Sequence, residues 1–211
     1  MNIIKGNNTV YIQPSEWVTK LWGNNNICYG IKQKSLPFGV DTDKFKNIMP
    51  IEERNKVFVY YKSRDPNLLN IIDSLLKSNN IDYKLFSYNN RYDENIYIEY
   101  LKHSKYGIWI GCHESQGFAL EEALSSNVPL FVWNVKSMNE EYMSNYADIA
   151  ATSIPYWDEQ CGEHFYNLDE LVSKFSLFLS KLYTYKPREY ILEKLSMEKC
   201  EQQFINLIDE M

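Results

Sequence analysis

The chain has 211 residues, enough for one large domain or two small ones with a substantial core. Its 28 Asp and Glu outnumber its 22 Lys and Arg, and no basic stripe is present, which disfavours broad nucleic-acid binding. No apolar run approaches the roughly 20 residues of a transmembrane helix, and residues 1–6 lack the apolar core of a signal peptide. We therefore expect a globular cytoplasmic protein whose four scattered cysteines, Cys28, Cys112, Cys161 and Cys200, are reduced thiols.

The first 50 residues predict a strand, a helix and a second extended piece, followed by a linker. Residues 10–13 are a short strand candidate, and residues 14–22 carry apolar side chains at helical spacing before Gly23. Residues 31–38 predict a second extended piece. Residues 39–50 are polar and broken, which is typical of a linker.

From residue 56 onward, apolar segments alternate with helical patterns. This alternation predicts a doubly wound parallel sheet with right-handed crossovers, in which ligands bind at the carboxyl ends of the strands. We expect residues 150–158 to form an extended surface segment. The predicted strands are 57–61, 83–88, 106–110 and 130–133, and the predicted helices are 65–78, 93–104, the segment after Glu114, 168–182, a short helix from 187, and 197–208.

The segment from Trp109 to Leu124 combines a strand end, a polar turn and a helix start. The first backbone N–H groups of a helix lack partners within the helix and form a ready anion site. Glu114 lies just before this helix, and Glu122 lies within it. Two carboxylates could therefore bracket a ligand whose phosphates meet the helix N-terminus.

The spacing of Glu114, Gly117 and Glu122, followed by an apolar strand, resembles the nucleotide-sugar site of retaining GT-B glycosyltransferases of the group 1, or family 4-like, type. Residues 39–45 resemble the Gly-Val-Asp-Thr element of that family, and residues 14–18 resemble the end of its N-terminal domain. The resemblance implies an α/β fold with a Rossmann-like sheet, similar to the C-terminal half of such an enzyme. Residues 1–38 would be a remnant of the N-terminal domain plus a linker, and residues 39–211 the nucleotide-sugar-binding domain.

The same resemblance implies a role for each site residue. Lys62 and Arg64 would bind the diphosphate, although the family often spaces this basic pair further apart. Glu122 would bind the ribose hydroxyls, and Glu114 would face the donor sugar as the catalytic carboxylate. The further donor-binding residues would be Ser115, Gln116, Gly117 and Phe118 through backbone N–H groups, with Tyr88 as a candidate to stack on the base.

Ser115 and Gln116 also fit a second interpretation, in which they cap the helix start. The implied reaction transfers a sugar from a UDP-sugar or GDP-sugar with retention, without a cofactor and without an essential metal. In this family the acceptor contacts come from the N-terminal domain. A partner chain or a homo-oligomer would therefore supply the acceptor half.

Three alternatives remain open at this stage. The chain is either a transferase or a non-catalytic nucleotide or nucleotide-sugar binding module. A less favoured alternative is an α/β-hydrolase, in which Ser115 is the nucleophile of a strand–turn–helix elbow, His164 the base, and Asp148 or Asp158 the acid of the triad. Against this alternative, His113 occupies the first position of the elbow, which needs a small residue. Residues 157–162 form either a pocket wall or a packed surface loop.

A metal site is not expected from the sequence. Cys112 and His113 are adjacent and would point apart on an extended chain, and Cys161 with His164 forms only half a ligand set.

Overall fold

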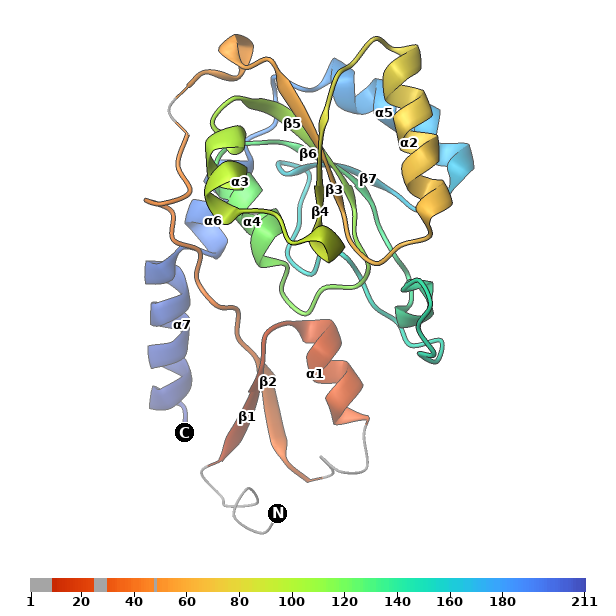
Figure 1. Cartoon of the computed structure of the whole chain (residues 1–211). Helices are drawn as coiled ribbons and strands as arrows, with labels where there is room; N and C mark the ends of the chain where they lie inside the picture. The colour runs from red at the N-terminus through yellow and green to blue at the C-terminus, as the bar shows by residue number, and fades with distance from the viewer. Residues whose placement is uncertain (1–8, 25–29, 48) are drawn as a thin grey trace.

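The computed structural model describes residues 9–24, 30–47 and 49–211. It contains a small β-α-β unit and a larger α/β body, and α7 lies beside the small unit (Figure 1). Residues 1–6, considered above for a signal peptide, and Cys28 lie outside the described residues. The other three cysteines are free, as expected for reduced thiols.

The small unit is the strand–helix–strand that the sequence predicts. Strands β1 (Val10–Gln13) and β2 (Lys32–Ser35) pair in parallel, and helix α1 (Glu16–Gly23) connects them. A parallel pair requires such a crossover, because a tight turn reverses the chain direction.

The larger body is built on a five-stranded sheet whose strands are all parallel. The strands are β3 (Lys56–Tyr61), β4 (Lys84–Ser87), β5 (Ser104–Ile110), β6 (Leu130–Trp133) and β7 (Gly162–Phe165), in the order β4-β3-β5-β6-β7. The chain moves outward from β3 to β4 and then returns past β3 to β5. This reversal creates a topological switch point between β3 and β5, where ligands bind in open α/β sheets.

Helices cover both faces of the sheet, which confirms the predicted doubly wound architecture (Figure 1). Helices α2 (Pro66–Ser78) and α5 (Leu168–Ser180) lie on one side, and α3 (Glu94–Leu101), α4 (Phe118–Ser125) and α6 (Pro187–Lys194) lie on the other. Side chains alternate between two cores along each strand, so that Val57 and Val59 join one core while Phe58 and Tyr60 join the other. The remaining elements are α7 (Met197–Asp209) and the single 3₁₀ turns η3 (Ile51–Glu53), η4 (Tyr88–Asn90) and η5 (Met138–Glu140).

The structure corrects the sequence analysis between residues 150 and 165. Ser153 and Ile154 are buried, so this segment is not a surface strip. Residues 157–162 lead directly into β7, a fifth strand that the sequence analysis did not predict, and Cys161 is fully buried in the core. The short polar stretch Gly-Glu-His-Phe lacks the apolar run that identified the other strands of this sheet.

The small unit packs against the larger body at one end of the sheet. The Trp17 indole N–H donates to the Glu114 carbonyl at 2.9 Å, and the Tyr156 hydroxyl donates to the Pro14 carbonyl at 2.6 Å. Tyr11 and Ile12 on β1 remain 43% and 36% exposed. Among the described residues, no helix is both long and apolar enough to cross a membrane.

Candidate functional site

A cavity of about 870 Å³ opens at the carboxyl ends of β3 and β5, at the topological switch point. Six of the residues singled out from the sequence line it: Lys62, Tyr88, Glu114, Gly117, Phe118 and Glu122. The other lining residues are Tyr60, Asn89, Arg91, Tyr92, Glu94, Trp109 and Ala119.

Backbone hydrogen bonds beyond the strand ends bring Lys62 and Glu114 together. The Lys62 N–H donates to the Ile110 carbonyl, and the Lys62 carbonyl accepts from the Cys112 N–H, both at 3.0 Å. The Glu114 N–H then donates to the Thr152 carbonyl at 2.9 Å. The two loops are thereby fixed side by side at the sheet edge.

The Lys62 ammonium forms an ion pair with the Glu114 carboxylate and contacts both of its oxygens. Lys62 Nζ lies 2.8 and 2.9 Å from the two carboxylate oxygens, and both side chains are largely buried. Burial disfavours the ammonium, but the neighbouring carboxylate outweighs this effect and raises the pKa of Lys62. The same ammonium lies 4.7 Å from the centre of the Tyr88 ring. Lys62 is therefore a fixed cation in the cavity wall.

Glu122 faces the same cavity from α4. Its pKa is raised to about 7 by burial and by the negative charge of Glu94, against a smaller opposing effect of Lys44. Glu94 itself pairs with Lys44 at 2.6 Å. Near neutral pH, Glu122 is therefore poised between its acid and carboxylate forms.

Helix α4 begins at Phe118, and its N-cap is Gly117 with φ of 96°. This left-handed conformation favours glycine, and it turns the chain from the loop into the helix. Neither Ser115 nor Gln116 caps the helix, so that alternative interpretation is wrong. Phe118 and Ala119, the first two residues of α4, line the cavity, and first-turn N–H groups lack helix partners.

Arg64 does not accompany Lys62 into the cavity. Its side chain is 4% exposed and donates to the carbonyls of Gly111 and Trp133, at 3.1 and 3.4 Å, and to Glu140 at 3.3 Å. This corrects the expectation that Arg64 lies among the ligand-binding residues. Its guanidinium instead connects Gly111, just after β5, with Trp133 of β6 and Glu140 of η5.

Gln116 and Ser115 are expected to contact the donor through their backbone N–H groups, and their side chains lie outside the cavity wall. The Gln116 side chain is buried, accepts from the Phe38 N–H at 2.8 Å, and donates to the Phe38 carbonyl at 2.6 Å and to Glu121 at 3.0 Å. It connects the linker to α4 and does not line the cavity. Ser115 is exposed and is also absent from the cavity wall.

Arg91 and an aromatic wall of the cavity were not predicted from the sequence. Arg91 follows η4 with φ of 44° and lines the cavity, and no ion pair joins it to another described residue. Tyr60 stacks on Trp109 at 3.8 Å between ring centroids, with Tyr92 edge-on to Tyr60. The position of Arg91 after a strand at the ligand-binding edge was the available signal.

The hydrolase alternative finds no support in the geometry. The nucleophile of an elbow occupies a strained turn, whereas Ser115 is not among the described non-glycine residues with positive φ. No hydrogen bond links Ser115 to His164 within the described part of the chain. His164 instead packs edge-on against Trp157 and Tyr166.

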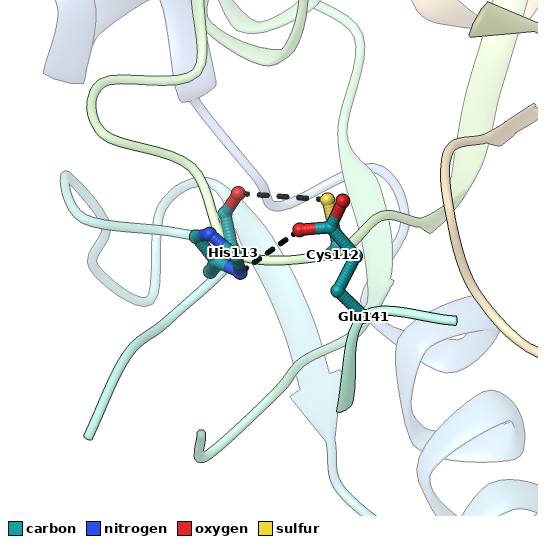
Figure 2. A group of neighbouring side chains, drawn as sticks. All are labelled: Cys112, His113 and Glu141. Carbon is teal, nitrogen blue, oxygen red and sulfur yellow. Dashed lines mark hydrogen bonds and ion pairs between the residues drawn. The ribbon is translucent and has the colours of Figure 1, made fainter. Parts of the chain in front are cut away.

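Cys112 and His113 do not point apart, contrary to the sequence-based expectation. Together with Glu141 they place one potential metal-ligand atom each within 4.8 Å of the others (Figure 2). Strand β5 ends at Ile110, two residues before Cys112, and the three ligand atoms lie near one another beyond this strand end.

Comparison with solved structures confirms the fold. The chain resembles a glycosyltransferase from Rickettsia africae ESF-5, with a TM-score of 0.60 and 15% identity over 99% of this chain and 64% of the other. It also resembles the catalytic domain of starch synthase IV from Arabidopsis thaliana, bound to ADP and acarbose, with a TM-score of 0.60 and 13% identity over 97% of this chain and 56% of the other. The chain thus has a glycosyltransferase-like fold and spans less than two thirds of either protein. No protein-family model matches the sequence, and a search of curated proteins gives no match.

Proposed function

We propose that the chain binds a nucleotide-diphosphate sugar in the cavity between β3, β5 and α4 and takes part in transfer of the sugar with retention. The observation that carries the proposal is the convergence of Lys62, Glu114 and Glu122 on one cavity at the switch point. Fold similarity adds support, because the similar starch synthase domain is bound to ADP. The proposal assigns a part of the ligand to each wall of the cavity.

The diphosphate lies against the basic side of the cavity and the start of α4. Lys62 and Arg91 are the cations that line it, and Arg91 takes the place that the sequence analysis gave to Arg64. The acidic charges nearby are partly compensated, since Glu114 pairs with Lys62 and Glu94 with Lys44. The backbone N–H groups at Phe118 and Ala119 add partial positive charge.

The nucleoside and the sugar lie on opposite sides of the phosphates. The Glu122 carboxylate accepts hydrogen bonds from the ribose hydroxyls, and the ring of Tyr88, 54% exposed at the rim, stacks on the base. Glu114 faces the sugar, with Lys62 fixing its orientation. The catalytic role of Glu114 is to hold the sugar and stabilise positive charge that develops on it.

A non-catalytic binding module is the second candidate. One observation favours it: both oxygens of Glu114 are engaged by Lys62, which reduces the acceptor capacity of the carboxylate. Both candidates require the same donor site, so binding tests the site and turnover separates the two.

Calorimetric titration of the full chain with UDP, GDP and ADP tests the donor site. We expect micromolar binding of one nucleotide and at least a tenfold loss in Glu122→Ala, with no loss in the control Glu201→Ala, whose side chain is exposed on α7. Equal affinities in wild type and Glu122→Ala would refute the site. Release of sugar from the matching nucleotide sugar would then favour a transferase, and binding without release would favour a binding module.

A further inference from the structure

We propose that Cys112, His113 and Glu141 form a binding site for a zinc-type divalent transition metal. This site is separate from the nucleotide cavity, because none of the three residues lines that cavity.

Backbone hydrogen bonds fix the two neighbouring ligands at the end of β5. The Cys112 N–H donates to the Lys62 carbonyl at 3.0 Å, and the Glu114 N–H donates to the Thr152 carbonyl at 2.9 Å. His113 lies between these two anchors. Its ring packs edge-on against Trp17 and Tyr146, at centroid distances of 5.7 and 5.5 Å, which fixes the orientation of the imidazole.

The third ligand comes from the loop after η5. The Glu141 N–H donates to the Met138 carbonyl, and the next N–H, of Tyr142, donates to the Ser63 carbonyl at 2.9 Å. Glu141 is thereby held near the end of β3, and its carboxylate points toward His113 (Figure 2). Residues far apart in the sequence thus converge on one point.

The distances suit ligands of a shared ion better than a hydrogen bond. His113 Nδ1 lies 3.6 Å from a Glu141 oxygen, and the Nδ1 atom is buried without a hydrogen-bond partner among the described residues. Nitrogen and oxygen ligands about 2.0–2.1 Å from a tetrahedral zinc ion lie roughly 3.3 Å from one another. A metal ion would therefore satisfy the buried nitrogen, with the three ligand atoms drawing together from separations of no more than 4.8 Å.

The ligand types select the metal. A thiolate, an imidazole and a carboxylate together favour Zn²⁺ and similar borderline ions over Mg²⁺ or Ca²⁺, which prefer all-oxygen sites. Binding breaks the S–H bond of Cys112, forms a sulfur–metal bond and releases one proton to solvent. Three protein ligands leave a fourth position for water. The metal would link the loop around Glu141 to the segment after β5, where the ligand His113 directly precedes Glu114.

Cobalt(II) titration of the reduced full chain tests this site, because thiolate-to-cobalt charge transfer gives strong near-ultraviolet absorption. We expect one Co²⁺ per chain, displacement by Zn²⁺, and loss of the thiolate band in Cys112→Ala. His113→Gln and Glu141→Gln should weaken Co²⁺ binding at least ~10-fold. Control variants that replace Cys28, Cys161 or Cys200 by Ala, and His164→Gln, should bind as the wild type does.

Persistence of the band in Cys112→Ala, or absence of stoichiometric Co²⁺ binding by the wild type, would overturn the proposal. Circular dichroism identifies any variant that fails to fold. If Cys112→Ala does not fold, Co²⁺ binding by Glu141→Gln tests the metal site instead. Glu141 lies in a partly exposed loop, so its replacement removes no core packing. Unchanged Co²⁺ affinity in folded Glu141→Gln would then refute the three-ligand site.

Discussion

At the scale of single residues, Lys62 and Arg64 are two residues apart in sequence but occupy different environments. Lys62 lines the cavity, whereas the Arg64 guanidinium is buried among backbone carbonyls. Sequence analysis could identify the basic pair after β3 but not the direction of each side chain. It could likewise predict Glu114 and Glu122 from a spacing along one segment. Arg91 follows a predicted strand at the ligand-binding edge, but only the pairing of β4 beside β3 brings it to the cavity that Lys62 lines.

We predict reciprocal effects for Arg64→Met and Arg91→Met. Arg64→Met should lower the free energy of unfolding by about 2–4 kcal/mol, because it leaves buried acceptors without a donor. Nucleotide affinity of the folded protein should change less than about twofold. Arg91→Met should instead weaken nucleotide binding severalfold at nearly unchanged stability, because Arg91 is exposed and joins no ion pair with another described residue. Urea unfolding measures the stability of both variants, and calorimetry measures their nucleotide affinity. Weaker nucleotide binding in Arg64→Met, with unchanged binding in Arg91→Met, would instead assign the diphosphate contact to Arg64.

The raised pKa of Glu122 predicts that ligand affinity depends on pH. Its pKa of about 7 means that raising the pH from 6 to 8 converts most of the acid to the carboxylate, which can accept hydrogen bonds from both ribose hydroxyls. Affinity should therefore rise about tenfold over this interval. A nucleotide sugar is the suitable ligand, since its phosphates do not titrate there. Calorimetry at several pH values should give a flat profile for Glu122→Gln, and an equally steep profile in that variant would assign the effect to another group.

At the scale of elements, β7 shows what local sequence patterns miss. The predicted strands of the main sheet were apolar runs, but β7 is a short strand of mixed character that is recruited by pairing with β6. Gly162, at its start, has φ of 137° and lies against Leu130 of β6. The need for glycine arises from this tertiary contact, which sequence periodicity does not encode.

Gly162→Ala should destabilise the fold strongly. A Cβ atom at this position would lie 2.0 Å from the Leu130 carbonyl oxygen, and the positive φ is unfavourable for alanine. We expect a loss of more than about 3 kcal/mol in the free energy of unfolding, measured by urea denaturation. Gly23→Ala is the matched control, because a Cβ there meets no atom within 4 Å. A small effect of Gly162→Ala would mean that β7 moves away from β6 at little cost.

At the scale of the whole molecule, the alternation of strands and helices was sufficient to predict a doubly wound parallel sheet. Apolar periodicity reports which face of each element is buried, and a parallel sheet follows from the crossover helices. The order β4-β3-β5-β6-β7 places the switch point beside the predicted Glu114 segment. The convergence of Cys112 and His113 with Glu141 could not be predicted, because it depends on how two loops meet at one sheet edge.

Global stability should depend on pH through the buried carboxyl groups of α4. Burial raises the pKa of Glu121 to about 8, although the Gln116 side chain donates to it, and one Glu121 oxygen has no partner among the described residues. The folded state therefore retains protons that the unfolded chain releases near pH 4.5. Their stabilising contribution is complete below that pH and is lost as pH rises toward 8.

We predict that the free energy of unfolding falls between pH 5 and 8, by at most ~1.4 kcal/mol per pH unit for each such group. In Glu121→Gln the side chain is neutral at every pH, so the fall should be smaller than in the wild type. Glu201→Gln, at an exposed position on α7, should follow the wild type. Urea unfolding at pH 5, 6.5 and 8 measures the difference. Parallel profiles for wild type and Glu121→Gln would show that Glu121 ionises in the folded state at little cost, and the pH dependence would then have to come from other groups.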